Sequence, residues 1–166
     1  KAAGNAAIPF SVFKVTGVAR LELLERVNSN KKLSEEEQAE FANVKKRIHA
    51  ICEAAFKNNV RLFIDAEESW IQDAIDELTE NMMVQFNQKD FIVYNTVQLY
   101  RHDRLAYLKA MHARLKEKGA KTAVKLVRGA YMEKERKRAA EMGYLDPIQP
   151  NKESTDRDFN LAVDYC

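Results

Sequence analysis

Four short apolar runs that alternate with helical patterns constrain the fold of this chain most. They span residues 8–16, 60–66, 91–99 and 122–127, and they are rich in β-branched and aromatic side chains. Nearly continuous apolar runs of this length are typical of strands that are buried on both faces of a parallel sheet. The alternation of strand and helix therefore predicts an α/β protein in which helices cover a parallel sheet.

Helical periodicity fills the segments between and after these strands. The predicted helices span residues 18–28, 34–55, 69–86, 103–118, 130–142 and 154–165. Ser34 and Glu37 have the spacing of a capping box, which starts the second of these helices. Gly119 and Gly143 follow the fourth and fifth helices, and glycine commonly ends a helix at this position.

Two architectures fit this alternation, an open doubly wound sheet and a closed barrel. No G-x-G-x-x-G sequence follows any strand, which counts against a dinucleotide-binding open sheet. A complete (βα)8 barrel needs about 250 residues, whereas this chain has 166. We therefore expect residues 1–166 to form a single domain, the first half of a barrel: a partial (βα)8 TIM-type barrel of about four βα units with an extra N-terminal helical elaboration. Because such a half has two unpaired strand edges, its partner is either the missing C-terminal half or a second copy of the chain.

The composition counts against several other classes of protein. A formal net charge of +2 gives no concentrated basic face, so we expect no nucleic-acid partner. The apolar runs are shorter than the roughly 20 residues that cross a bilayer. Cys52 and Cys166 are the only cysteines and form no Cys/His cluster, so we expect no metal site, no disulfide framework and a reducing compartment.

A polar residue lies near the C-terminal end of each predicted strand. These residues are Lys14, Asp65, Gln98 and Lys125. In parallel α/β architectures the chemistry gathers beyond the C-terminal ends of the strands. Because burying such groups costs free energy unless they are paired, the four together predict one polar site at a shared rim.

The residue types indicate what this site could bind. The ammonium of Lys14 could reach toward an anionic substrate group, and Asp65 could orient a cation in the substrate or in a neighbouring side chain. The amide of Gln98 suits the edge of a heterocycle. The turn at residues 128–130 offers a guanidinium and backbone N–H groups to an anionic cofactor group, and Tyr131 could stack on a flat ligand.

Two charged stretches are expected to be structural. Glu67 and Glu68 follow the second strand and are expected to form an acidic first turn that stabilises the next helix. The run at residues 133–138 alternates in sign and is expected to be the solvated face of an exposed helix.

Several of these segments resemble the proline dehydrogenase family. The sequence KLVRGAY at residues 125–131, with the stretch GYLDP at residues 143–147, is similar to the fourth-strand region of that family. FIDAE at residues 63–67 resembles its second-strand motif, and SVFK at residues 11–14 resembles its first strand. The segments occur in the expected order and are most similar to the eukaryote-like branch.

This resemblance implies a distorted (βα)8 barrel that binds FAD non-covalently. It implies oxidation of L-proline to Δ1-pyrroline-5-carboxylate by hydride transfer to the flavin N5, with electrons passed on to a membrane quinone. It also implies a cytoplasmic protein with peripheral membrane association in a bacterium, or a protein of the mitochondrial matrix or inner membrane in a eukaryote.

The resemblance also implies roles for individual residues. Lys14 and Tyr131 would bind the substrate, and Asp65 and Lys125 would be catalytic, Lys125 at a position near flavin N5 that is commonly Arg in bacterial members. Met132 stands where the family often has Trp. The residues that the resemblance assigns to the cofactor are Ala66, Gln98, Lys125, Val127, Arg128, Gly129 and Ala130.

Two other interpretations of the same residues remain open at the level of sequence. Lys14 or Lys125 could be the nucleophile of a Schiff-base aldolase inside a barrel. The polar strand ends could also be incidental features of a non-catalytic binding or assembly module. Under the proline dehydrogenase interpretation, further substrate-binding arginines belong to the last helix of the barrel, so we expect this chain alone to be inactive.

Overall fold

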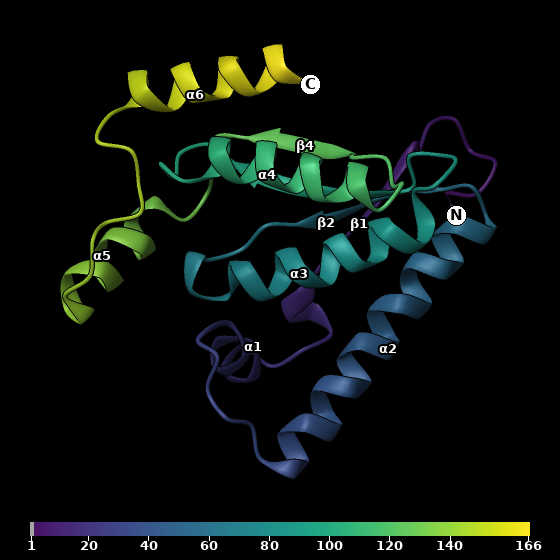
Figure 1. The fold of residues 1–166 in the computed structure, drawn as a ribbon, viewed down its shortest axis with the longest axis horizontal. Coiled ribbons are helices and arrows are strands. Elements are labelled where there is room, and N and C mark those ends of the chain that lie inside the picture. The colour runs from purple at the N-terminus through teal and green to yellow at the C-terminus, as the bar shows by residue number, and fades with distance from the viewer. Residues whose placement is uncertain (1) are drawn as a thin grey trace.

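The computed structural model describes residues 2–166 and contains one parallel four-stranded sheet in this part of the chain (Figure 1). Its strands are β1 (Phe10–Lys14), β2 (Arg61–Asp65), β3 (Val93–Gln98) and β4 (Val124–Val127). Each strand pairs in parallel with the next one along the chain, in the order β1-β2-β3-β4. A doubly wound sheet reverses its strand order at a switch point, and these strands do not. The partial-barrel prediction is therefore confirmed over the open sheet.

Six α-helices and one short 3-10 helix lie around this sheet in the described residues. They are η1 (Val15–Gly17), α1 (Leu21–Asn28), α2 (Glu35–Lys57), α3 (Ser69–Phe86), α4 (Arg104–Glu117), α5 (Met132–Met142) and α6 (Lys152–Tyr165). Figure 1 shows α3 and α4 beside the sheet, with α1 and α2 forming an additional layer against α3. This layer is the predicted N-terminal elaboration. No helix within residues 2–166 has the length and apolar character that a membrane span requires.

Several element boundaries differ from the sequence prediction by one to three residues, and two of them have identifiable reasons. The first strand ends at Lys14 rather than at Thr16, because the backbone N–H of Thr16 donates to the carboxylate of Glu67 instead of to a neighbouring strand. The fifth helix begins at Met132 rather than at Ala130, because Tyr131, with a φ of −118°, lies outside the helical range and is the N-cap residue.

Helix α2 begins with the predicted capping box. The Ser34 hydroxyl accepts from the backbone N–H of Glu37, and the Glu37 carboxylate accepts from the backbone N–H of Ser34. The buried side of the helix includes Val44, Ile48 and Cys52. Burial raises the pKa of the Cys52 thiol to about 12. Cys52 is thus a small apolar core residue, as its place in the helical pattern predicts.

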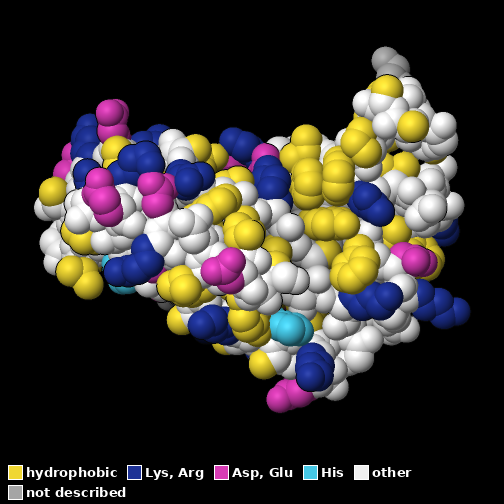
Figure 2. All heavy atoms as spheres, turned by 90° about the horizontal axis from the view of Figure 1, so that it is seen from above, with side chains coloured by type: hydrophobic (Ala, Val, Ile, Leu, Met, Phe, Trp, Pro, Cys, Tyr) yellow, Lys and Arg dark blue, Asp and Glu magenta, His cyan; other side chains and the backbone are white. Residues whose placement is uncertain are grey.

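The two faces of the sheet differ in what covers them. Leu62 and Ile64 of β2 are buried in the core beneath the helices. On the opposite face, Phe10 and Phe63 stack with their ring centroids 4.3 Å apart, and Val12 is 58% exposed. Figure 2 shows a dense group of hydrophobic side chains to the right of the centre of the view. In a closed barrel the face without helices is the interior, which further strands would enclose.

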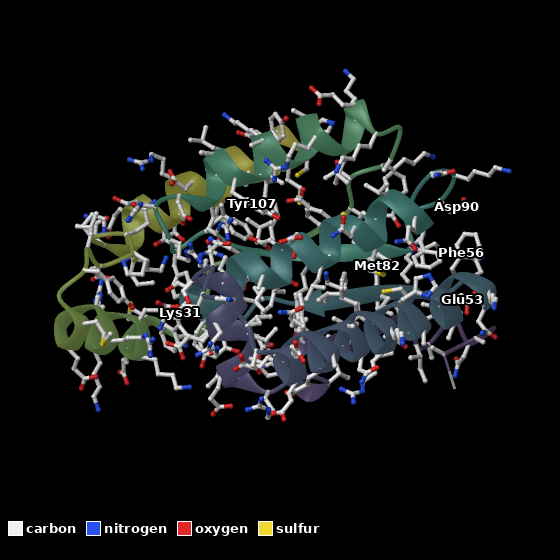
Figure 3. All side chains as sticks on the ribbon, turned by 60° about the horizontal axis from the view of Figure 1, so that its bottom comes forward. Lys31, Glu53, Phe56, Met82, Asp90 and Tyr107 are labelled. Carbon is white, nitrogen blue, oxygen red and sulfur yellow. The ribbon has the colours of Figure 1, made fainter. Side chains whose placement is uncertain are left out.

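A buried polar network connects α3, β3 and α4 on the helix-covered face. Asp76 and Arg104 form an ion pair of 2.9 Å, although they are only 4% and 3% exposed. Asp76 Oδ1 also accepts from the amides of Gln72 and Asn95, both at 2.9 Å. Tyr107, which Figure 3 shows between α3 and α4, accepts from Asn95. Because each charged group has a partner, the network can hold the three elements in register despite its burial.

We expect Asp76→Ala to lower the free energy of unfolding by about 3–5 kcal/mol, because it removes the buried partner of the Arg104 guanidinium and leaves only Asp103, at 3.8 Å. Urea unfolding followed by circular dichroism measures this loss. Asp73→Ala, at an exposed position of the same helix, is the matched control and should change stability by no more than about 0.5 kcal/mol. Equal effects of the two substitutions would contradict a specific role for the buried pair.

Candidate functional site

A hollow of about 310 Å³ lies at the C-terminal ends of the four strands. It is lined by Lys14, Asp65, Ala66, Thr96, Gln98, Lys125, Val127, Arg128, Gly129, Ala130 and Tyr131. This set contains all ten residues that the sequence predicted for the site, together with Thr96. The structure therefore brings every predicted position to one place.

The strand register explains why these side chains meet. Lys14 is paired with Asp65, and Thr96 with Lys125, across the parallel ladder. Paired residues of neighbouring strands point to the same face, and alternate residues along a strand do so as well. Thr96 therefore shares a face with Gln98, and strand alternation alone would have identified it.

Lys14 and Tyr131 form one corner of the hollow although 117 positions separate them. The Lys14 ammonium donates a hydrogen bond of 2.9 Å to the Tyr131 hydroxyl. It also lies 5.5 Å from the centroid of the tyrosine ring. This hydrogen bond is the main reason that the pKa of Lys14 is raised above its ordinary value. Lys14 therefore keeps its positive charge throughout the neutral pH range.

Asp65 and Lys125 form a second charged corner across β2 and β4. The Lys125 ammonium is in direct contact with Asp65 Oδ1, and both side chains are partly exposed to the hollow. The ammonium also lies 5.2 Å from the centroid of the Phe63 ring. The Thr96 hydroxyl lies 3.4 Å from Asp65 Oδ1. The cation that Asp65 orients in this structure is thus a neighbouring side chain.

The buried amide of Gln98 fixes the loop that follows β2. Its Nε2 donates a hydrogen bond of 2.8 Å to the backbone carbonyl of Glu67. Because Ala66 precedes that carbonyl, the amide of Gln98 holds the wall of the hollow that Ala66 forms.

The loop after β4 is shaped by a contact between Gly129 and Tyr100. A Cβ atom at Gly129 would lie 2.3 Å from Cδ1 of the Tyr100 ring. The backbone N–H of Tyr100 also donates to the carbonyl of Arg128 at 2.7 Å. The Arg128 side chain is directed to α6, where its guanidinium pairs with Asp156 at 2.6 Å and lies 4.4 Å from the Phe159 ring.

The prediction that Glu67 and Glu68 form an acidic first turn of α3 is wrong. Both carboxylates precede the helix, which begins at Ser69 and has no acid in its first turn. The Glu67 carboxylate accepts from the backbone N–H and the hydroxyl of Thr16, after the end of β1. Glu68 pairs with Lys134 of α5 at 2.6 Å. Both acids are buried because they join the β2–α3 loop to other segments around the hollow.

The expectation that the run at residues 133–138 is wholly solvated is also wrong. Glu135 is completely buried, and its carboxylate accepts two hydrogen bonds from Ser69. Arg138 pairs with Glu25 of α1. Alternation of charge alone does not reveal these partners. The spacing of four residues between Tyr131 and Glu135 places both on one side of the helix, and this was the available signal.

We expect Gly129→Ala to displace the Tyr100 ring or the loop at residues 128–131, because the new methyl group overlaps the ring and Gly129 has a positive φ. Overpacking of this kind costs about 1–3 kcal/mol, which a shift of the thermal unfolding midpoint reports. Gly17→Ala is the matched control, since a Cβ there would meet no atom within 4 Å. A Gly129→Ala variant as stable as the control would contradict the close approach of Tyr100.

Comparisons with known proteins bear on the family of this chain and on its fold. The sequence profile of the family described as proline dehydrogenase matches residues 4–166. The mitochondrial proline dehydrogenase 1 of Caenorhabditis elegans is 39% identical over 131 residues, which cover 79% of this chain and 21% of that protein. The hydroxyproline dehydrogenase of Xenopus laevis is 39% identical over 132 residues, which cover 80% of this chain and 28% of that protein. The chain thus spans less than a third of the length of each relative.

Solved structures share the fold. Proline utilization A from Bdellovibrio bacteriovorus has a TM-score of 0.78 at 19% identity, and the match covers 93% of this chain and 15% of that chain. The same protein from Corynebacterium freiburgense has a TM-score of 0.78 at 20% identity, covering 98% of this chain and 16% of that chain. With a family profile that matches almost every residue, the chain belongs to the proline dehydrogenase family.

Proposed function

We propose that this chain is the first half of an FAD-dependent barrel that oxidises L-proline to Δ1-pyrroline-5-carboxylate and passes the electrons to a membrane quinone. One observation carries this proposal. In a chain of the proline dehydrogenase family, charged and amide side chains from the ends of all four strands line one hollow of about 310 Å³.

The residues around the hollow fit a flavin cofactor. Lys125 offers a cation and Gln98 an amide, and the loop at residues 128–130 offers its backbone. The Tyr100 ring, which lies against Gly129, fixes the course of this loop. Together with Ala66 and Val127, these residues would hold FAD. When bound, FAD supplies a two-electron oxidation in which the hydride from the substrate carbon is accepted at flavin N5.

Lys14 and Tyr131 are suited to hold the carboxylate of proline. Lys14 keeps its charge at neutral pH, and the Tyr131 hydroxyl to which it donates fixes the position of the ammonium. Such a charge-assisted contact orients a carboxylate strongly. The pair would bind the carboxylate of proline. The ring of the substrate would then lie toward the side of the hollow that Lys125 lines.

Asp65 is suited to position Lys125. Their direct contact holds the ammonium at the rim of the hollow. A fixed cation stabilises negative charge that develops near it during the reaction, without the cost of reorganising solvent. The ammonium of Lys125 is a compact point charge. An arginine at this position would instead present a planar fork of hydrogen-bond donors.

The lysine environments disfavour the Schiff-base aldolase. A lysine nucleophile must lose its proton, and enzymes lower its pKa for this purpose. The pKa of Lys14 is raised instead, and the Lys125 ammonium is engaged in an ion pair with Asp65.

The proposed barrel needs strands beyond the four described. One face of the sheet carries the Phe10–Phe63 stack and the exposed Val12 without a helix over it. Four further strands from a longer chain, or a second copy of this one, would enclose that face. The relatives, of which this chain spans less than a third, support the longer chain. Residues 1–166 alone are then expected to be inactive.

We expect the full-length protein to purify yellow with bound FAD and to lose its flavin absorbance when proline is added without oxygen. A soluble quinone should then restore the oxidised spectrum. Proline and hydroxyproline should be compared, because relatives of both names match this chain. A colourless protein that stays inert with added FAD would overturn the proposed function, and residues 1–166 alone provide the inactive control.

We expect Lys14→Met to raise the KM for proline by about 10- to 100-fold, the effect of losing one hydrogen bond to a charged group. Flavin content should remain unchanged, because Lys14 is assigned to the substrate and not to the cofactor. Steady-state kinetics and the ratio of flavin to protein absorbance measure the two quantities. Lys46→Met, at an exposed position of α2, is the control. Parallel loss of flavin and proline affinity would indicate a structural role for Lys14.

A further inference from the structure

Glu135 of α5 is a completely buried carboxylate that lies outside the lining of the hollow. Both of its oxygens accept hydrogen bonds from Ser69, one from the backbone N–H and one from the hydroxyl, each 2.6 Å long. These two donors are neutral. Because a buried charge is costly unless its surroundings stabilise it, an apolar residue would be a simpler way to pack α5 on α3. We therefore expect the carboxylate to do more than pack α5 against α3.

The position of Ser69 explains how this charge is stabilised. Ser69 is the first residue of α3, and the preceding residue, Glu68, makes no side-chain cap. Glu135 provides the missing acceptor from a different helix, and the positive end of the α3 dipole stabilises its charge. Glu68 pairs instead with Lys134, the neighbour of Glu135. The starts of α3 and α5 are thus joined by two charged contacts.

These two helix starts carry two different walls of the hollow. The β2–α3 loop contributes Ala66, and the β4–α5 loop contributes residues 128–131. In the sheet β3 lies between β2 and β4, so no backbone ladder joins the two loops directly. Glu135 lies one helical turn after Tyr131, and its N–H donates to the Tyr131 carbonyl at 2.9 Å. Movement of Glu135 relative to Ser69 would therefore move Tyr131.

We infer that Glu135 is a positioning residue: by capping α3 from α5, it sets the separation between the Ala66 loop and the loop that carries Tyr131. It acts through Tyr131, whose hydroxyl accepts from Lys14. The effect on proline binding rests on the proposed function, whereas the mechanical link between the two loops does not.

Kinetics of the full-length, flavin-loaded protein test the effect on the substrate. Glu135→Ala should raise the KM for proline by about tenfold or more, since small displacements of a positioned group cost factors of this size. The kcat should change less, and Glu135→Gln, which keeps one acceptor for the Ser69 N–H, should restore part of the affinity. Glu133→Gln, at an exposed position of the same helix, should behave as wild type. Loss of flavin and kcat at an unchanged KM would overturn the inference.

Amide hydrogen exchange of the full-length protein tests the link without proline. Glu135→Ala should accelerate exchange in peptides that cover residues 66–72 and 128–136, while β3 keeps its protection. Acceleration confined to residues 66–72 would overturn the inference, because the cap would then serve α3 alone. Should Glu135→Ala fail to fold, Glu135→Gln and Ser69→Ala provide both measurements. Should the wild-type protein not oxidise proline, coupled exchange would still support the link and separate it from the failed function.

Discussion

The parallel register of four consecutive strands is the constraint on which the rest of this structure depends. It places Lys14 beside Asp65 and Thr96 beside Lys125 on one face of the sheet. A slip of one residue in any strand would turn its polar side chains into the helix-covered core and its core residues outward. The hydrophobic pattern that buries residues such as Ile64 is therefore also what assembles the charged rim.

Strand β3 shows how closely the two faces are connected. Asn95 donates to Asp76 in the network beneath the helices. Its neighbour Thr96 points the other way and lies beside Asp65 in the hollow. A strand with polar partners on both faces is held more specifically than one that only packs apolar side chains. This specificity suits a site in which four strand ends must keep fixed relative positions.

The sequence was sufficient for the sheet, most of the helices and the polar strand ends Lys14, Asp65, Gln98 and Lys125, because these follow from periodicity and from the ends of apolar runs. Ala66 and Val127 were expected only from the family resemblance. The sequence was insufficient for the partners of charged side chains. Glu135 and Ser69 are 66 positions apart, and Glu67 bonds to a residue 51 positions before it. Periodicity indicates which face a residue occupies, but it carries no information about which distant segment covers that face. The pair of Asp76 and Arg104 was missed for the same reason.

The uncovered face of the sheet has a consequence for how such a protein is made. In the proposed barrel the first four strands leave the ribosome before the strands that enclose them. At about 5–20 residues per second, a second half of similar length follows with a delay on the order of ten to thirty seconds. During that interval Phe10, Val12 and Phe63 remain accessible to other nascent chains. The nascent chain would then need chaperones to protect this face, whereas the complete barrel would not.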